Sequence, residues 1–277
     1  MPDSLKRLLR SPQGMIGTVI LLACLVLVLL GPWLAPYDHQ ALSITARYRP
    51  PGAEHWLGTD QLGRDIASRI LVGARATILL SLLATGLAML IGAMLGTACA
   101  YLGGRFDEVM MRTMDALMSI PSLLFALLIV STLGKSGMNA VLAITVSFIP
   151  GMVRIARSVA LAQRRQDYVG AAIARGESSL WIVSRELLPN IAAPIIVEAT
   201  IRVAFAIMLF ATLSFLGLGA QPPAPEWGLM VAEARGYFFQ APWMMLMPGL
   251  AIALVAIGFN LLGDGLRDAL NPRSGER

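Results

Sequence analysis

The sequence predicts an all-α membrane protein that crosses the bilayer several times. Of its 277 residues, 56% are hydrophobic and 14% are charged, and the mean hydropathy is +0.69. An average soluble domain carries about 25% charged residues. Long apolar runs recur along the whole chain, separated by shorter polar segments. Backbone groups inside hydrocarbon must bond within their own segment, so we expect these runs to be helices of one membrane domain.

Six apolar runs approach the length that crosses a membrane, about 20 residues of helix. The expected spans cover residues 14–34, 77–101, 119–133 with a helix start near 107, 138–153, 191–216 and 243–262. The expected organisation is a cytoplasmic tail (1–13), a first transmembrane helix (14–34), an extracytoplasmic loop (35–76), a five-helix core (77–265) with a cytoplasmic loop at 154–190, and a cytoplasmic tail (266–277). We expect Pro121 and Pro150 to bend the third and fourth spans.

The N-terminal segment has features of a secretory signal peptide, because Lys6, Arg7 and Arg10 precede an apolar run. That run is too long for a typical signal and lacks a clear cleavage site, so we interpret it as a retained span. Most of the 22 basic residues lie in segments that an inside N-terminus places in the cytoplasm. The net charge of +5 is therefore attributed to orientation in the bilayer, not to nucleic-acid binding.

Two groups of charged residues call for a structural or functional explanation, one inside an expected span and one in the first loop. Glu198 and Arg202 are four positions apart in the fifth expected span, hence on one helical face. Ionisable groups inside a membrane are costly, so they either pair with each other or line a polar translocation path. In the first outer loop, Asp60, Arg64 and Asp65 are expected to form a local ion-pair cluster.

The sequence offers no catalytic or metal-binding constellation. Cys24 and Cys99 lie in apolar runs, where cysteine acts as a small hydrophobic residue. His39 and His55 have no second ligand at metal-binding spacing. A phosphate-binding loop is also missing from the sequence. We therefore expect a protein that is not itself an enzyme and binds neither metal nor cofactor.

The segment between the fourth and fifth expected spans predicts a pair of short helices. Asp167 is the expected N-cap of the first, and Gly176 is its expected C-terminal stop. A second helix is expected to start at Ser178 or Ser179. It should end near 188–189, giving a helix–turn–helix elbow.

Small side chains would keep the contact surface of this elbow shallow. Ala171, Ala172 and Gly176 are the residues concerned, and a groove on another protein could receive them. An ordinary amphipathic connector between spans explains these residues equally well.

The same segment resembles the coupling-loop signature of ABC import permeases, E-A-A-x-x-x-G-x9-I-x-L-P. The matching residues are Ala171, Ala172, Gly176, Leu188 and Pro189. Gly170 stands in place of the signature glutamate, and Glu186 in place of the apolar residue. The resemblance implies that the first short helix docks on an ATP-binding subunit.

Three further segments resemble the second, C-type permease subunit of the peptide and nickel importers. They cover residues 55–65, 214–228 and 263–273. The resemblance implies the six-helix type I ABC importer fold in a bacterial inner membrane, with both termini in the cytoplasm. It also implies a sister permease, two ATP-binding subunits that hold ATP and Mg²⁺, and an extracytoplasmic solute-binding protein.

The implied cargo is a di- or oligopeptide, with nickel or a metal chelate as the alternative. Many relatives carry a glutamate four positions before the Ser-Phe-Leu-Gly stretch, and here Phe210 takes that place. Glu226 and Trp227 could contact the binding protein, although Trp227 could equally be an interfacial anchor. Two other classes stay open, a secondary transporter and a membrane scaffold.

Overall fold

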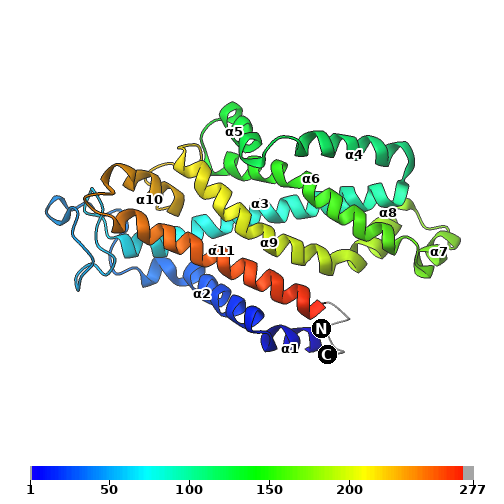
Figure 1. Ribbon diagram of the computed structural model, residues 1–277, viewed down its shortest axis with the longest axis horizontal. Helices are drawn as coiled ribbons and strands as arrows, with labels where there is room; N and C mark the ends of the chain where they lie inside the picture. Colours follow the sequence, from blue (N-terminus) through cyan, green and yellow to red (C-terminus); the bar gives the residue numbers. More distant parts are fainter. Residues whose placement is uncertain (1, 271–277) are drawn as a thin grey trace.

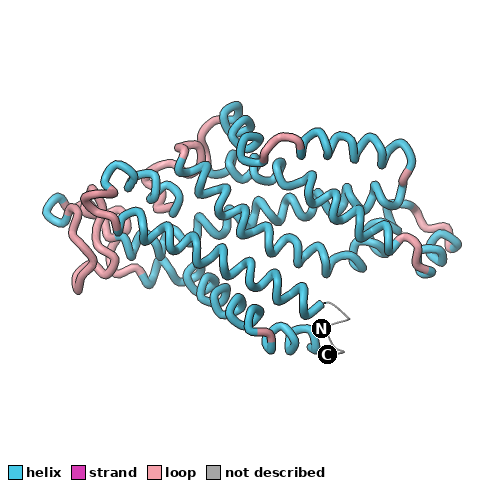
Figure 2. The backbone as a smooth tube through the Cα atoms, in the orientation of Figure 1, coloured by secondary structure: helices cyan, strands magenta, loops and turns pink. Residues whose placement is uncertain are grey.

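The computed structural model describes residues 2–270, and nearly all of its ordered elements are helices (Figures 1 and 2). Their bounds are α1 Pro2–Arg10, α2 Pro12–Leu34, η1 Ile44–Ala46, α3 Ile66–Leu102, α4 Gly104–Met118, α5 Ser122–Leu133, α6 Gly137–Gln163, α7 Asp167–Ala174, α8 Ser179–Trp181, η2 Ile182–Leu187, α9 Leu188–Phe215, α10 Trp227–Ala234, η3 Arg235–Tyr237 and α11 Trp243–Leu270. Within the described range the only β pairing is an isolated bridge between Thr59 and Asp65. The predicted all-α class is confirmed.

Within residues 2–270, five continuous helical stretches are long and apolar enough to cross a membrane. They are α2, α3, α6, the stretch from α8 through α9, and α11. A sixth crossing is available if α4 and α5 count as one broken span, because the two helices meet at 89°. Pro121 is the residue just before α5 and has an extended backbone, with ψ of 131°. Proline has no N–H to donate and disfavours helix before it, so the predicted bend occurs there.

Several spans are longer than predicted, and α6, for example, runs to Gln163 rather than to residue 153. α3 begins at Ile66 rather than at residue 77, because the Asp65 carboxylate accepts a bond from the Ser68 N–H at 2.8 Å and caps the helix there. At 1.5 Å per residue α3 is about 56 Å long, well beyond the roughly 30 Å of hydrocarbon. α11 likewise continues to Leu270, past the predicted boundary at 265. Residues 271–273, part of the third resemblance, lie outside the described range.

Helix α3 lies at the centre of the bundle and packs against α2, α6 and α9. Gly92 and Gly96 face α6, where an added methyl group would collide with Met152 and Val153. The Gly-x-x-x-Gly spacing therefore serves packing inside the protein. Pro150 lies within α6, which remains one helix from Gly137 to Gln163.

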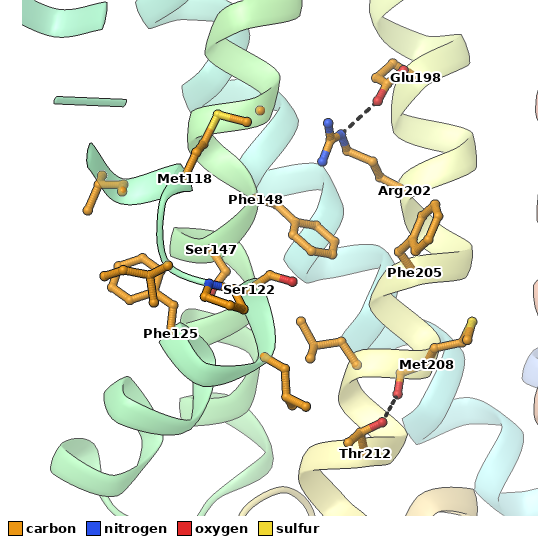
Figure 3. Close-up of a pocket in the computed structure, with 16 residues that line it drawn as sticks. Met118, Ser122, Phe125, Ser147, Phe148, Glu198, Arg202, Phe205, Met208 and Thr212 are labelled. Carbon is orange, nitrogen blue, oxygen red and sulfur yellow. Dashed lines mark hydrogen bonds and ion pairs between the residues drawn. The ribbon is translucent and has the colours of Figure 1, made fainter. Parts of the chain in front are cut away.

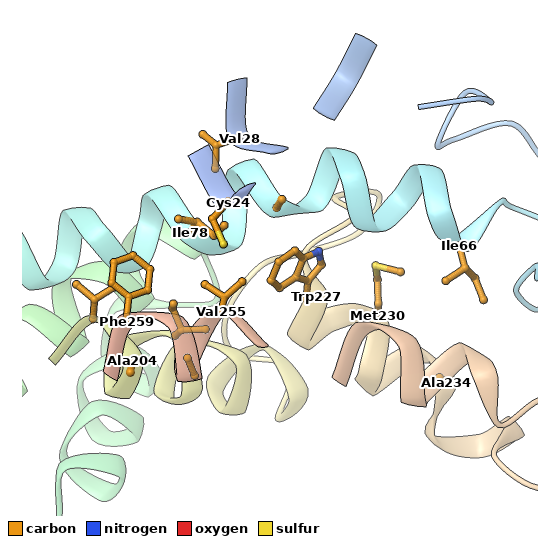
Figure 4. Packing of buried hydrophobic residues seen from close by; sticks show 14 of the residues in the cluster. Cys24, Val28, Ile66, Ile78, Ala204, Trp227, Met230, Ala234, Val255 and Phe259 are labelled. Atoms are coloured by element: carbon orange, nitrogen blue, oxygen red, sulfur yellow. The ribbon is translucent and has the colours of Figure 1, made fainter. Parts of the chain in front are cut away.

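The main hydrophobic cluster joins α2, α3, α9, α10 and α11, as Figure 4 shows. Cys24 is one of its members, and Cys99 is completely buried elsewhere in α3. Both thiols are free, as expected of cysteines that fill apolar space.

The long axis of the molecule separates two sets of connections (Figure 1). The loop between α2 and α3 lies at one end, close to α10. The elbow of α7 and α8 lies at the other end, and helix α1 and the last turns of α11 lie in the half of the molecule toward that end. The predicted topology requires the N-terminal tail, the elbow and the end of the last span to share one side, and the structure agrees.

Candidate functional site

Helix α7 forms the first arm of the elbow. Gln166 is its N-cap and Asp167 its first helical residue, so the predicted cap was one residue too late. Asp167 still lies in the first turn, where a negative charge suits the helix dipole. At the other end Gly176 has φ of +78°, and the Glu177 N–H donates to the Ala172 carbonyl at 3.2 Å. This is a Schellman stop, so the predicted role of Gly176 is confirmed.

The second arm starts as predicted and does not end as predicted. The Ser178 hydroxyl accepts a bond from the Trp181 N–H at 3.3 Å and caps α8. The helix then continues through a π-helical turn, Ile182–Leu187, into α9 without a break at Leu188 and Pro189. The π turn bonds the Leu188 N–H to the Val183 carbonyl, and Pro189 lies in the first turn of α9, where its missing N–H is tolerated.

The two faces of α7 differ in what they offer a partner. Val169 and Ala172 are buried against Ile182 and Leu187, so Ala172 does not belong to the outer surface. The exposed surface of α7 instead carries Gly170, Ala171, Ile173 and Ala174, and on α8 the apolar side chain of Leu180 is exposed as well. The elbow therefore presents small and apolar residues on its exposed surface. Sequence reasoning missed Ile173 and Leu180, which carry no motif signal.

Both departures from the signature fit the structure without strain. Gly170 faces open space, because outside its own stretch of helix no atom lies within 4 Å of the position a Cβ would occupy. Glu186 lies on the second arm, and its Oε1 is 3.2 Å from Nη2 of Arg175 on the first. Arg175 also stacks over the Trp181 ring, 5.7 Å from its centroid. The two arms are thus joined by an ion pair where the signature has an apolar contact.

A cavity of about 600 Å³ lies between the α4–α5 bend, α6 and α9 (Figure 3). Glu198 and Arg202 both line it, and Arg202 Nε is 3.0 Å from Glu198 Oε1. The predicted pair therefore forms, and it borders a space large enough for a small molecule. Phe148 on α6 faces the guanidinium, 5.8 Å from its ring centroid.

Glu226 and Trp227 lie inside the protein. The Glu226 carboxylate accepts bonds from the N–H groups of Gly228 and Leu229 at 2.9 and 2.8 Å, and so caps α10. Trp227 donates its indole N–H to the Ile70 carbonyl at 3.0 Å. Neither side chain is accessible for direct contact with a binding protein or with lipid in this conformation, because both are at most 1% exposed. Their role here is to join α10 to α3.

The ion-pair cluster of the first outer loop exists but has other members than predicted. Asp60 Oδ2 lies 2.6 Å from Arg64 Nε and 2.6 Å from Arg69 Nη1. Glu233 on α10 completes the cluster, 2.8 Å from Arg64 and 3.0 Å from Arg69. Asp65 instead caps α3 and lies 2.9 Å from Nδ1 of His55.

Between residues 2 and 270, no three His, Cys, Asp or Glu side chains come together in a way that could hold a metal ion. Phe210 occupies the position at which many relatives carry a glutamate. Its side chain is fully buried among apolar residues of α3, α5, α6 and α9.

Comparison with known proteins gives a consistent result along the chain. Residues 88–276 match the family model described as "Binding-protein-dependent transport system inner membrane component". Residues 2–51 match the "N-terminal TM domain of oligopeptide transport permease C".

Several curated proteins are similar over nearly their whole length. One is a probable D,D-dipeptide transport system permease protein of Escherichia coli K12, 45% identical over 96% of this chain and 89% of that protein. A putative peptide transport system permease protein of Brucella suis is 44% identical, over 97% and 90%. A dipeptide transport system permease protein of Alkalihalophilus pseudofirmus is 39% identical, over 98% and 89%.

Proposed function

The chain belongs to the family of inner membrane components of binding-protein-dependent transport systems, and on this basis we propose that it carries short peptides through an ATP-driven importer. The observation that carries the proposal is the near full-length similarity to permeases named for dipeptide or peptide transport. These three relatives are named for peptides and not for nickel, so peptides are preferred over the metal alternative.

The chain works as one half of a permease pair with a sister subunit. Two ATP-binding subunits hold ATP and Mg²⁺ and perform the hydrolysis, and this chain binds neither. This division is supported by the exposed small and apolar side chains of the elbow, Ala171 and Ile173 on α7 and Leu180 on α8, which suit a groove on a partner. Closure of the ATP-binding pair would then shift the spans between inward- and outward-facing states.

The elbow end of the molecule faces the cytoplasm in this proposal, together with both termini. The distribution of arginine and lysine supports this orientation, because the segments at the elbow end hold most of the basic residues. The opposite end, with the loop between α2 and α3 and helix α10, then meets the solute-binding protein. Glu226 and Trp227 do not take part in that contact in this conformation, since both of these side chains are buried.

The test is uptake by proteoliposomes that contain this chain, its sister permease, its ATP-binding subunits and its binding protein. Labelled alanyl-phenylalanine should accumulate only when ATP is supplied. Accumulation driven by an ion gradient without ATP would support a secondary transporter. Nickel uptake without peptide uptake would support the metal alternative, and absence of both would leave a scaffold role.

A further inference from the structure

We propose that the cavity beside Glu198 and Arg202 is a binding site for the carboxylate end of a short peptide, with Arg202 as the recognising group. The inference rests on the proposed function and adds to it the chemistry of one site. Both residues lie on α9 and line the 600 Å³ cavity, which falls within the 300–1,000 Å³ typical of small-molecule sites.

The guanidinium of Arg202 is incompletely used by the protein. Its Nε lies 3.0 Å from Glu198 Oε1, close enough for an ion pair. The alignment is poor, however, and Nε is a buried donor without a hydrogen-bond partner among the described residues. An arginine can donate five N–H groups in a planar fork that matches a carboxylate. Nε is enclosed by the protein, so a peptide carboxylate would bind the two Nη nitrogens, which have no hydrogen-bond acceptor among the described residues.

The helix opposite is shaped to admit this side chain. A methyl group added to Gly151 on α6 would lie 2.7 Å from Nη2 of Arg202 and 3.1 Å from Nη1. Gly151 and Arg202 both line the cavity, so the guanidinium meets α6 at the cavity wall. A larger residue at this position would displace the end of the arginine rather than the backbone.

The rest of the cavity is mainly apolar. Figure 3 shows the charged pair at one end and Thr212 at the other, with Phe148 from α6 and Phe205 from α9 between them. A peptide bound through its carboxylate would therefore place apolar side chains against aromatic rings. Glu198 acts as a positioning residue, since it neutralises Arg202 when no cargo is present and limits the cost of a charge in the membrane.

The experiment compares ATP-driven uptake of alanyl-phenylalanine with uptake of its C-terminal amide. The wild-type complex should prefer the free carboxylate. The double variant Glu198→Gln/Arg202→Gln removes both charges and leaves neither unpaired, so a purely structural pair would tolerate it. We expect instead that its uptake of the free peptide falls by about 10- to 100-fold, while uptake of the amide changes little.

A second variant keeps both charges. Gly151→Ala should move the guanidinium and reduce the preference for the free carboxylate, whereas Gly249→Ala should leave it unchanged. Gly249 is the matched control because nothing lies within 4 Å of its Cβ position. A double variant that retains the wild-type preference, or a wild-type complex that takes up peptide and amide equally, overturns the carboxylate site and leaves the peptide importer intact. Failure of the wild type to take up either compound overturns both.

Discussion

Arg175 and Glu186 join the two arms of the elbow, with Nη2 of the arginine 3.2 Å from Oε1 of the glutamate. The coupling signature has an apolar residue in place of Glu186, so the charge alone would suggest a degraded motif. The structure shows a substitute contact instead, supported by the stacking of Arg175 on Trp181. The pair is partly exposed and contributes at most about 1 kcal/mol, so packing of α7 on the π turn remains the main support of the elbow.

Ala171 and Ala172 give the sharpest test of docking, because they are neighbours with opposite exposure. We expect Ala171→Glu to fold normally and to reduce ATP-driven uptake by about tenfold or more, since it places a charge on the exposed face of α7. Ala172→Glu should destabilise the elbow itself, because Ala172 is fully buried. Co-purification of the ATP-binding subunits and thermal unfolding separate the two effects. Wild-type uptake by Ala171→Glu would contradict docking through this face.

Gly170→Glu restores the residue that the signature has at this position. The site is sterically open, and removing a glycine from a helix gains roughly 0.5–1 kcal/mol. We expect slower hydrogen exchange in α7 and uptake at least equal to that of the wild type. Gly170→Ala provides the matched control, because it changes helix propensity without adding a carboxylate. Any difference in uptake between the two variants reports a contact of the carboxylate with the ATP-binding subunit.

Asp60→Asn should destabilise the end of the protein that carries α10 and the loop between α2 and α3. It removes the charge shared by Arg64 and Arg69, and breaking a buried pair costs about 3–5 kcal/mol. Glu54→Gln is the control, since it breaks the exposed Arg49–Glu54 pair, which contributes about 0–1 kcal/mol. Thermal unfolding in detergent measures both. Equal effects of the two substitutions on thermal stability would show that the buried cluster stabilises the protein no more than the exposed pair does.

Glu226 predicts a specific pH dependence of stability. Burial raises the pKa of this carboxyl above its usual value of 4.5, and the N–H groups of Gly228 and Leu229 oppose the shift only in part. Between the usual and the raised pKa the folded protein keeps a proton that the unfolded chain has released, so stability falls as pH rises above about 4.5. Glu226→Gln should flatten this part of the curve, measured by unfolding midpoints across pH. An unchanged slope would disprove the assignment.

Local features of the sequence predicted much of this structure. Pro121, Gly176 and Ser178 act through their own backbone or side chain, so their effects on bend, stop and cap follow from residue type. The continuation through Pro189 did not follow, because it depends on a π turn whose bonding the sequence pattern does not reveal.

Contacts between distant segments could not be predicted. Arg69 and Glu233 are 164 positions apart and meet only because α10 folds back against α3. Tryptophan often anchors a protein at the membrane interface, yet Trp227 is buried. Gly73 allows the loop that precedes Trp227 to approach α3 closely. Gly151 on α6 meets Arg202 on α9, and the residue type of Gly151 does not predict this contact between separate helices.

The uninterrupted path from Ser179 to Phe215 has a mechanical consequence. Ser179 belongs to the elbow and Arg202 to the cavity, and a helix covers the distance between them in about 35 Å. With no loop between, this segment acts as a lever arm. A tilt of about 10° at the elbow would carry the arginine sideways by roughly 6 Å over that length. In the proposed importer, a displacement of the elbow would therefore reach the cavity between α5, α6 and α9 through one continuous helix.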